Sequence, residues 1–599
     1  MARATPLPLA RVTLGPSRGR SQLDAPSGVA EPREASRPCD PCQTTCGLLG
    51  GACGTSVASI PTERHGPVPE PVRPHMSHSD GKLHHLLIDR ANGDPHAPAY
   101  GPVSYGALAA RAARVAGTLR ETGVRRGARV AIALDGRVEY LVAYYGTLMA
   151  GATVVPLSPE LPGASLSPIL DHCGATAVVA AGPTLDRMAG HDCLPRRLRL
   201  ALHVGTPPRT LPPVIDSIDF AVAEESGREI SDAGRQRSSL ACVSYTSGTT
   251  GAPKGVMLSH DNLVSNIRSI VDYLELGPED RVAMVLPYHY VYGNSVLHTH
   301  LVAGGSIVDA GSSVFPVRVL EAIRDERCTG LSGVPSTFAS LVRVCDPERF
   351  DLSSLRYLTQ AGGAMTTGLT RRVRATFPDA RLYVMYGQTE AGARLSYLPP
   401  HDLERKMGSV GIPIPGVSLR VVDESGRPVP AGTVGEIVAT GANVMVGYLG
   451  EPTATKQALR GGVLHTGDVG YLDPDGYLFI SGRNDEMISS GGHRIGPQEV
   501  ENVISALPGV TGCAVVGVRD ELLGERLVAV LVLQEGGQID RRFVQRACLA
   551  ALPRYKVPKE VRFVTELPHS ERGKLLRSVV RARLEGDAAP SAPVVETSR

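Results

Sequence analysis

Apolar and polar residues alternate along most of this chain in two periods, one typical of helices and one of strands. Leu108–Leu119 and Tyr140–Ala150 carry apolar side chains at helical spacing. Arg129–Leu134 and Ala177–Ala181 are short apolar runs with the length of a buried strand. Because segments of both kinds follow one another from about 82 to 480, we expect an α/β fold with a largely parallel sheet.

The pattern changes after residue 417. Ser418–Val422 and Gly435–Thr440 read as hairpin strands, and a turn-forming run follows the first of them. Beyond residue 485, one face of a predicted helix carries Val500, Val503, Ile504 and Leu507. Two strands are predicted after it, at Cys513–Val518 and Leu527–Leu533. A helix at Arg542–Leu552 and a strand at Val561–Val564 follow. We therefore expect a β-hairpin subdomain followed by a small α+β domain.

Composition separates the start of the chain from the rest. The 599 residues are 42% hydrophobic and carry a net charge of +2, which excludes a wholly disordered chain and does not suggest a nucleic-acid-binding surface. Residues 1–75 hold eight arginines, six acids and twelve prolines, so the whole charge excess lies there. We predict a leader at 1–75, a large N-terminal domain at 82–484, a small C-terminal domain at 485–585 and a disordered tail at 586–599.

The leader is predicted to be disordered, because it is rich in proline, arginine and serine and has no periodic apolar segment. Cys39, Cys42, Cys46 and Cys53 have spacings that could bind zinc, but the second pair is not a C-x2-C knuckle. Met76 lies just before the first periodic segment, so translation from that residue is an alternative.

Residue usage also bears on the compartment. Seven cysteines lie singly in the body of the chain, which suits reduced thiols in the cytoplasm. No secretory signal or membrane span is predicted, because arginines interrupt the start and the most apolar stretch, Leu141–Leu157, is broken by glycine and proline. The chain contains seven lysines and 55 arginines. Because arginine is strongly preferred, each lysine is a candidate for a functional position that needs a compact point charge.

The strongest single motif is the run Tyr245-Thr246-Ser247-Gly248-Thr249-Thr250-Gly251-Ala252-Pro253-Lys254-Gly255. It follows a predicted strand, Leu240–Val243, and precedes a predicted helix, Asp261–Leu274. Glycines let the backbone wrap around an anion, and hydroxyls, amides and a lysine supply donors and charge, so the run predicts a phosphate-binding loop. A Walker-type loop needs glycine before the lysine and Ser or Thr after it, and Pro253 and Gly255 exclude that class.

Four further motifs accompany this loop. They are Gly362-Gly363-Ala364, Tyr386-Gly387-Gln388-Thr389-Glu390, Thr466-Gly467-Asp468 with Gly482-Arg483, and Glu571-Arg572-Gly573-Lys574. In order and spacing they resemble the motifs of the acyl- and aryl-adenylate-forming (AMP-binding) enzyme superfamily, which includes acyl-CoA synthetases, adenylation domains of peptide synthetases and firefly luciferase. The resemblance covers roughly residues 82–585 and looks closest to the acyl-CoA synthetases.

The resemblance implies a site for ATP and AMP. In similar enzymes the motif tyrosine stacks on adenine, the threonine contacts phosphate and the glutamate holds Mg²⁺, which assigns those roles to Tyr386, Thr389 and Glu390. Asp468 and Arg483 correspond to ribose-binding residues. The other nucleotide-binding residues implied are Thr246, Ser247, Gly248, Thr249, Thr250, Gly251, Lys254, Gly362, Gly363, Ala364, Gly387 and Gln388.

The resemblance further implies two half-reactions that use ATP, Mg²⁺ and CoA. A carboxylate attacks the α-phosphate of ATP while the catalytic lysine, Lys574, stabilises the developing charge. A mobile C-terminal domain then turns about a hinge at Asp485, and a thiol attacks the acyl-AMP. Gly491, Gly492 and Arg494 would face CoA.

The acid is predicted from Leu286–Val308, which contains no Asp or Glu. Amino-acid-activating relatives place an aspartate in this region to pair the substrate ammonium, and a buried ammonium without a carboxylate is costly. An apolar aliphatic or aryl acid is therefore favoured. The acyl pocket implied by the resemblance consists of His289, Tyr290, Asn294, Val334, Thr337 and Met385.

Three alternatives to an acid–CoA ligase stay open from the residues. A stand-alone enzyme that loads the phosphopantetheine thiol of an acyl or peptidyl carrier protein is compatible with Ser489, where many relatives have lysine. A luciferase-like oxidase is the second. The third is a nucleotide-binding pseudoenzyme with an interaction role, which the retained charged motif residues disfavour.

Overall fold

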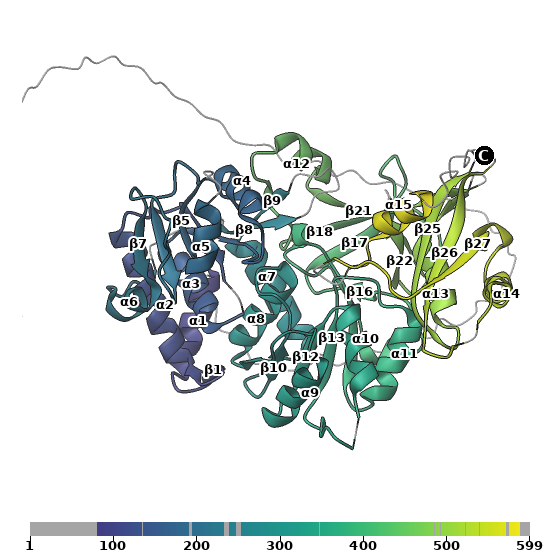
Figure 1. Cartoon of the computed structure of the whole chain (residues 1–599), viewed down its shortest axis with the longest axis horizontal. Helices are drawn as coiled ribbons and strands as arrows, with labels where there is room; N and C mark the ends of the chain where they lie inside the picture. Colours follow the sequence, from purple (N-terminus) through teal and green to yellow (C-terminus); the bar gives the residue numbers. More distant parts are fainter. Residues whose placement is uncertain are drawn as a thin grey trace, which may run out of the picture. The chain divides into compact units, whose positions relative to one another are not determined.

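In a computed structural model of the chain, the described residues are 81–134, 136–190, 194–232, 239–246, 253–346, 348–483, 486–490, 493–520, 523–537, 539–570 and 574–586. The leader with its cysteines, the tail after 586 and the expected hinge at Asp485 lie outside these ranges, so the expectations about them stay predictions. The described residues form four sheets with helices packed against them (Figure 1).

The first large sheet has eight strands in the order β19-β9-β8-β4-β3-β5-β6-β7. The run from β8 to β7 is parallel, with Val130 of β3 opposite Val154 of β4, and β9 and β19 close one edge in antiparallel fashion. In sheet order the strands are Gly447–Tyr448, Lys254–Ser259, Leu240–Thr246, Thr153–Pro156, Arg129–Ala133, Ala175–Ala181, Leu200–Val204 and Asp216–Asp219.

The second large sheet has nine strands in the order β16-β15-β14-β13-β12-β10-β11-β1-β2. The strands from β14 to β1 are parallel, and β16, β15 and β2 are antiparallel additions at the two edges. In sheet order they are Ile412–Pro413, Ser396–Leu398, Arg381–Tyr386, Tyr357–Gln360, Gly330–Gly333, Arg281–Met284, Ser306–Asp309, Pro98–Tyr100 and Val103–Ser104.

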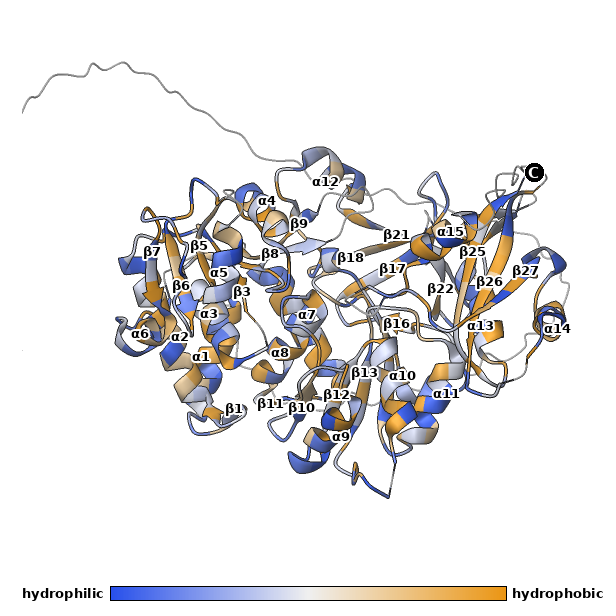
Figure 2. Cartoon of the chain, in the orientation of Figure 1, coloured by the Kyte–Doolittle hydropathy of each residue, from blue (hydrophilic) through white to orange (hydrophobic). Residues whose placement is uncertain are grey.

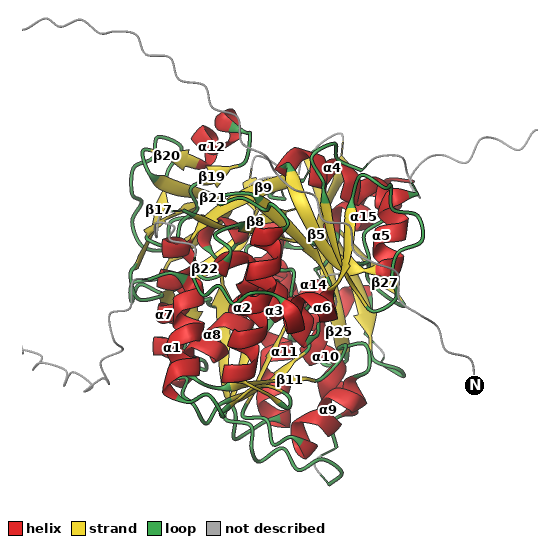
Figure 3. Ribbon diagram, turned by 90° about the vertical axis from the view of Figure 1, so that its left-hand side faces the viewer, coloured by secondary structure: helices red, strands yellow, loops and turns green. Residues whose placement is uncertain are grey.

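The helices cover both faces of both sheets, as the alternation along the strands requires. In β3, Val130 and Ile132 pack with α2 and α3, whereas Ala131 and Ala133 pack with α4 and α5. In the other sheet, one face packs on α7 and α8 and the opposite face on α9, α10 and α11. Figure 3 shows α2, α3 and α6 in the foreground, in agreement with the contacts of α2 with each of the other two helices.

The largest core therefore lies between the two sheets, around α7 and α8. The helices of this large part are α1 Leu83–Gly93, α2 Tyr105–Glu121, α3 Val138–Met149, α4 Gly163–Cys173, α5 Gly182–Ala189, α6 Phe220–Ser226, α7 His260–Leu274, α8 Val291–Ala303, α9 Pro316–Asp325, α10 Pro335–Val344, α11 Thr367–Thr376 and α12 Pro452–Ala458.

Two smaller sheets follow. The hairpin sheet is antiparallel, in the order β17-β18-β21-β20 with β22 paired to β21, at Val417–Val422, Gly435–Gly441, Val463–Leu472, Leu459–Arg460 and Leu478–Arg483. The C-terminal sheet runs β24-β23-β26-β25 with β27 parallel to β26, at His493–Ile495, Ile488–Ser490, Gly524–Leu533, Val510–Asp520 and Glu560–Val564. Its helices are α13 Pro497–Ser505, α14 Arg541–Ala551 and α15 Arg577–Gly586. Figure 2 shows apolar residues along β25 and β26, whose side chains form the core of this part.

The α/β class and the expected helices and strands are confirmed within a few residues at their ends. The helix expected after the phosphate loop is present as α7, but a strand that the sequence did not predict precedes it. Lys254–Ser259 forms a strand, β9, that pairs with β8, and only then does α7 begin. Ser259 caps that helix in a capping box, in which its hydroxyl accepts from the Asn262 amide at 3.1 Å and the Asn262 side chain accepts from the Ser259 amide at 2.9 Å.

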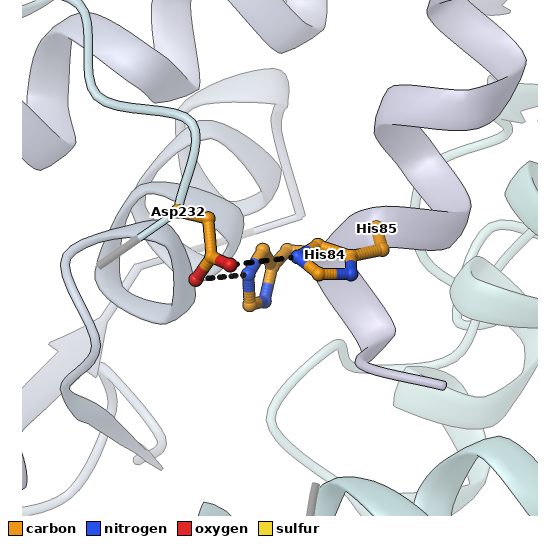
Figure 4. Close-up of side chains that lie close together, drawn as sticks. All are labelled: His84, His85 and Asp232. Carbon is orange, nitrogen blue, oxygen red and sulfur yellow. Dashed lines mark hydrogen bonds and ion pairs between the residues drawn. The ribbon is translucent and has the colours of Figure 1, made fainter. Parts of the chain in front are cut away.

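The start of α1 is held by an ion pair. The Lys82 ammonium lies 2.9 Å from the Asp232 carboxylate, and His84 and His85 approach the same carboxylate at 3.6 and 3.2 Å (Figure 4). Burial lowers the pKa of His84 to about 3, so its ring is neutral. A divalent cation here would meet the Lys82 charge, and we interpret the cluster as an ion pair rather than a metal centre. Among the described residues, no helix is both long and apolar enough to cross a membrane.

The two large-sheet strands β10 and β13 are linked by a buried carboxylate. Asp280, fully buried, accepts from the Gly277 amide and the Thr329 hydroxyl, both at 2.9 Å, and pairs with Arg356 at 2.5 Å. Burial alone would raise the pKa of Asp280, but the Arg356 guanidinium and the other donors outweigh it and lower the pKa below 3.8.

We expect Asp280→Asn to lower the free energy of unfolding at neutral pH by about 1–3 kcal/mol, because the amide cannot satisfy the same donors. A lowered pKa in the folded state stabilises the fold above the unfolded-state pKa, and this stabilisation is lost as pH falls through the folded pKa. Urea unfolding at pH 7 and near pH 3 measures both effects. Asp325→Asn, at an exposed pair with Arg324, is the matched control; an equal effect of the two substitutions would contradict the prediction.

Candidate active site

A cavity of about 1120 Å³ brings the sequence motifs together. Its wall is formed by β8, β9, β21, β22 and β25 and by the segments after β14 and before α15. The predicted site residues that line it are Thr246, Lys254, Gly387, Gln388, Thr389, Glu390, His289, Tyr290, Arg483 and Lys574. Residues from five separate motifs thus line one cavity.

The phosphate loop connects the two strands of a hairpin. Thr246 ends β8 and Lys254 begins β9, and the two residues are paired across the strands. The Lys254 ammonium lies 5.4 Å from the centre of the Tyr448 ring, within the range of a cation–π contact. The loop residues Ser247, Gly248, Thr249, Thr250 and Gly251 lie outside the described part of the chain. The hairpin therefore places a hydroxyl and an ammonium on the same wall of the cavity.

Glu390 stands in a single 3-10 turn, Thr389–Ala391, immediately after the end of β14. The Tyr448 hydroxyl donates to Glu390 Oε1 at 2.8 Å, and the Glu390 carbonyl accepts from the Met445 amide at 2.8 Å. Burial and the neighbouring Glu390 carboxylate raise the pKa of Tyr448, so the phenol stays a donor. The Tyr448 side chain thus contacts both Lys254, through its ring, and Glu390, through its hydroxyl.

Asp468 is fixed by strand register. It lies opposite Arg483 across β21 and β22, with 3.1 Å between Asp468 Oδ1 and Arg483 Nε. The Tyr386 hydroxyl donates to Asp468 Oδ2 at 2.6 Å. Burial raises the pKa of Asp468, while Arg483 and Tyr386 oppose that rise. Both carboxylate oxygens are thereby occupied, and Arg483 lines the cavity while Asp468 is buried beside it.

Lys574 faces the cavity, consistent with the predicted catalytic position. Burial lowers the pKa of its ammonium, and the neighbouring Arg483 lowers that pKa further, whereas Glu486 and Asp468 raise it. Its backbone is held by Ser570, which accepts from the Lys574 amide at 3.2 Å through its hydroxyl. The cavity is therefore lined by five lysine or arginine residues, Lys254, Arg483, Lys574, Arg577 and Arg581, a set suited to a polyphosphate.

The six residues expected in the acyl pocket divide into two groups. His289 and Tyr290 line the cavity, with 4.0 Å between their ring centroids. Asn294 instead donates to the Tyr140 hydroxyl at 2.7 Å and to the Tyr288 carbonyl at 3.1 Å, and it borders a separate space of about 10 Å³. Val334, Thr337 and Met385 are not among the residues that line the cavity, so their contacts with the acid stay predictions.

The remaining expected residues are placed as follows. Gly362, with φ of +81°, and Gly363 form a turn that the Gln360 side chain holds by donating to the Gly363 carbonyl at 2.8 Å. Gly362, Gly363, Ala364 and Tyr386 are not among the lining residues of the cavity, so their contacts with adenine stay predictions. Arg494 is paired with Ser489 in the β23–β24 hairpin; its side chain, Gly491 and Gly492 lie outside the described part.

Three residues of the site were not anticipated from the sequence: Tyr448, Glu486 and Arg577. Glu486 lines the cavity near Lys574, and Arg577 joins it at 3.3 Å and the buried Glu501 at 2.6 Å. No local pattern marks them, because each acts through a partner distant in the sequence. Only the position of Tyr448, shortly after the predicted hairpin strand Gly435–Thr440, could have drawn attention to it.

The fold and the cavity define a class: an α/β protein with a cavity lined by several lysine and arginine side chains. Residues 87–449 match the family described as AMP-binding enzyme, and residues 499–574 match the AMP-binding enzyme C-terminal domain. A feruloyl-CoA synthase of Amycolatopsis sp is 35% identical over 83% of this chain and 98% of its own length. An indoleacetate–CoA ligase of Aromatoleum aromaticum is 34% identical over 80% of this chain and 92% of its own.

A solved structure of ATP-bound MatB from Rhodopseudomonas palustris is similar over the same region. It matches 85% of this chain and 99% of its own, with a TM-score of 0.75 and 32% identity. The chain belongs to the AMP-binding enzyme family.

The electrostatics of Lys574 lead to a prediction about its titration. Because the Glu486 carboxylate raises the pKa of Lys574 against the lowering by burial and Arg483, we expect Glu486→Gln to lower that pKa further. Competitive acetylation across pH, read by mass spectrometry with the exposed Lys456 as internal reference, measures it. Glu404→Gln, at an exposed pair with Arg374, is the control. An unchanged or higher pKa of Lys574 in Glu486→Gln would contradict the conclusion that Glu486 raises this pKa.

Proposed function

We propose that this protein is an AMP-forming acid–CoA ligase that activates a carboxylic acid as an acyl-adenylate. The observation that carries the proposal is the convergence of Lys254, Glu390, Arg483 and Lys574 on one cavity of the size of a nucleotide site. The membership of the family and the two related acid–CoA ligases support the same chemistry.

In the first half-reaction a carboxylate oxygen bonds to the α-phosphorus of ATP and pyrophosphate leaves. The chain contributes position and charge rather than covalent chemistry. Lys574 stabilises the charge that develops on the α-phosphate, and Lys254 and Thr389 bind phosphate oxygens. Arg483 and Asp468 hold the ribose once its hydroxyls displace the present contacts between them.

Mg²⁺ fits the cavity wall, because the Glu390 carboxylate and the Thr389 hydroxyl offer the hard oxygen donors that this ion prefers. When bound, the ion would neutralise charge on the ATP phosphates. The Tyr448 hydroxyl fixes the orientation of the Glu390 carboxylate for that purpose.

In the second half-reaction a thiol sulfur attacks the acyl carbonyl and AMP leaves. We propose that the C-terminal part, residues 485–585, turns about Asp485, withdraws Lys574 and presents the 488–495 hairpin with Arg494 to CoA. A carrier-protein thiol in place of CoA is the second candidate, and Ser489 in that hairpin is compatible with it. We further propose a cytoplasmic location, which agrees with the six cysteines that are free among the described residues.

The acid is proposed to have an apolar aliphatic or aryl body. The segment from Leu286 to Val308, which contributes His289 and Tyr290 to the cavity, carries no Asp or Glu that could pair a substrate ammonium. Feruloyl and indoleacetate, the acids named for the two relatives, both have aryl bodies.

ATP–pyrophosphate exchange over a panel of aliphatic, aryl and amino acids tests the proposal, followed by thioester formation with CoA or a carrier protein. We expect exchange with at least one acid that lacks an ammonium, and thioester formation with CoA. Exchange with none of the acids would favour a nucleotide-binding pseudoenzyme, and thioester formed with the carrier protein alone would favour the second candidate.

We expect Lys574→Ala to reduce pyrophosphate exchange by about 100-fold or more, because one preorganised cation at the reacting phosphate is lost. The same variant should transfer a supplied acyl-adenylate to thiol at close to the rate of the unchanged protein, because Lys574 has left the site by then. Single-turnover assays of each half-reaction measure the two rates. Lys456→Ala, at an exposed lysine, is the control. Equal losses in both steps would contradict the two-conformation mechanism.

A further inference from the structure

One buried cation stands apart from the others. Among the described residues, three lysine or arginine residues are less than 9% exposed: Lys82, Arg394 and Lys406. Lys82 pairs with Asp232, and Lys406 pairs with Asp473 and Asp475. Arg394, 3% exposed, forms no ion pair with any described carboxylate. An arginine buried without a counter-charge is costly, so the missing partner calls for an explanation.

The contacts of Arg394 are all with neutral groups. Its Nε lies 3.3 Å from Met385 Sδ, and its Nη1 lies 3.4 Å from the Ala393 carbonyl. The guanidinium stacks over the Tyr292 ring at 4.3 Å from the ring centre. A guanidinium has five N–H donors, and its neighbours here are a thioether sulfur, one long contact to a carbonyl and the Tyr273 side chain, none of which carries a negative charge. The guanidinium is thus buried among described residues that supply no anion to balance its charge.

The backbone that carries Arg394 is rigid and strained. Its carbonyl accepts from the side-chain amides of Asn266 at 3.0 Å and Asn443 at 2.9 Å. Ala393, directly before it, has φ of +132°, a conformation that non-glycine residues rarely adopt. Strain of this kind persists only where the surroundings enforce it, and it gathers at functional sites. The chain therefore holds this side chain in one place.

That place lies beside residues that the sequence assigned to the acyl pocket, two of which do not themselves line the cavity. Met385 and Val334 are two of the residues assigned to the acyl pocket, and Tyr292 stands two residues after Tyr290, which lines the cavity. A Cβ atom added to Gly362 would lie 3.2 Å from Val334 Cγ1 and 4.0 Å from Tyr292 Cδ1, so these residues form one cluster. Arg394 supplies the only charge seen in this otherwise neutral group of described residues.

We propose that Arg394 is the anion-binding residue of the acyl pocket and that the acid carries a second anionic group, a carboxylate or sulfonate, besides the carboxylate that is activated. This proposal rests on the acid–CoA ligase function and narrows the expected acid from a wholly apolar one to an apolar body with a charged end. The planar fork of arginine matches such a group with two parallel hydrogen bonds. The Tyr292 ring supports the guanidinium from its other face.

The test uses matched pairs of acids that differ in the second anion: hexanoate with adipate, pentanoate with glutarate, and benzoate with terephthalate. Pyrophosphate exchange gives kcat/KM for each, in the unchanged enzyme and in Arg394→Met and Arg394→Lys. We expect the unchanged enzyme to favour the diacid of at least one pair. Arg394→Met should reduce the diacid-to-monoacid ratio of kcat/KM by about 10- to 100-fold, mainly through KM, because a charge-assisted hydrogen-bonded pair is lost.

Arg394→Lys should recover part of that ratio, since it restores the charge without the fork. Arg420→Met, at an exposed arginine of β17, is the matched control and should leave the ratio unchanged. A purely structural arginine would alter all acids alike. An unchanged ratio in Arg394→Met, or a preference of the unchanged enzyme for the monoacid in every pair, would overturn the proposal.

Thermal unfolding separates this proposal from the function on which it rests. ATP should raise the Tm of the unchanged enzyme and of both variants, which shows that they fold with an intact nucleotide site. The favoured diacid should raise the Tm of the unchanged enzyme but not that of Arg394→Met. If that shift is seen without exchange for any acid, the ligase function fails and the anion site stands. If exchange is seen and no diacid produces the shift, the anion site fails and the ligase function stands.

Discussion

The buried carboxylate of Asp468 is the constraint on which the site depends. A charge with 7% exposure is tolerated only when it is paired, and here it has two partners from different sheets. Arg483 lies directly opposite Asp468 in the β21–β22 pair, and the Tyr386 hydroxyl donates to Asp468 from the end of β14 in the nine-stranded sheet. Removing Arg483 would leave the charge uncompensated, and removing Tyr386 would cost the carboxylate a hydrogen bond. These contacts tie the hairpin sheet to the parallel sheet and bring the Thr466-Gly467-Asp468 motif next to the motif that begins at Tyr386.

The cationic character of the cavity follows from the same arrangement. Arg483 serves both as the partner of Asp468 and as the neighbour that lowers the pKa of Lys574. Glu486 and Arg577 extend the network into the C-terminal part, where Arg577 also neutralises the buried Glu501. A protein with a net charge of only +2 thus concentrates positive charge at one place, which is what a polyphosphate ligand requires.

Much of the fold could be predicted from the sequence, because helix and strand periods and turn residues are local properties. Thr246, Lys254, Thr389, Glu390, Arg483 and Lys574 could be assigned because each stands in a recognisable motif, and the structure brings them to one cavity. β9 was not anticipated, since a six-residue strand next to a glycine-rich loop carries little periodic signal. Asn294 is used inside the fold by Tyr140, a contact between residues 154 positions apart that no local pattern reveals.

The sequence by itself therefore determined the class of fold, the enzyme family and most of the charged residues that line the cavity. Tertiary structure alone decided which buried charges have partners. Tyr448 reaches Glu390 across 58 positions, and Arg394 lies on Tyr292 with no carboxylate beside it among the described residues. The physical reason is that the cost of a buried charge depends on everything packed around it, and that environment comes from segments far apart in the chain.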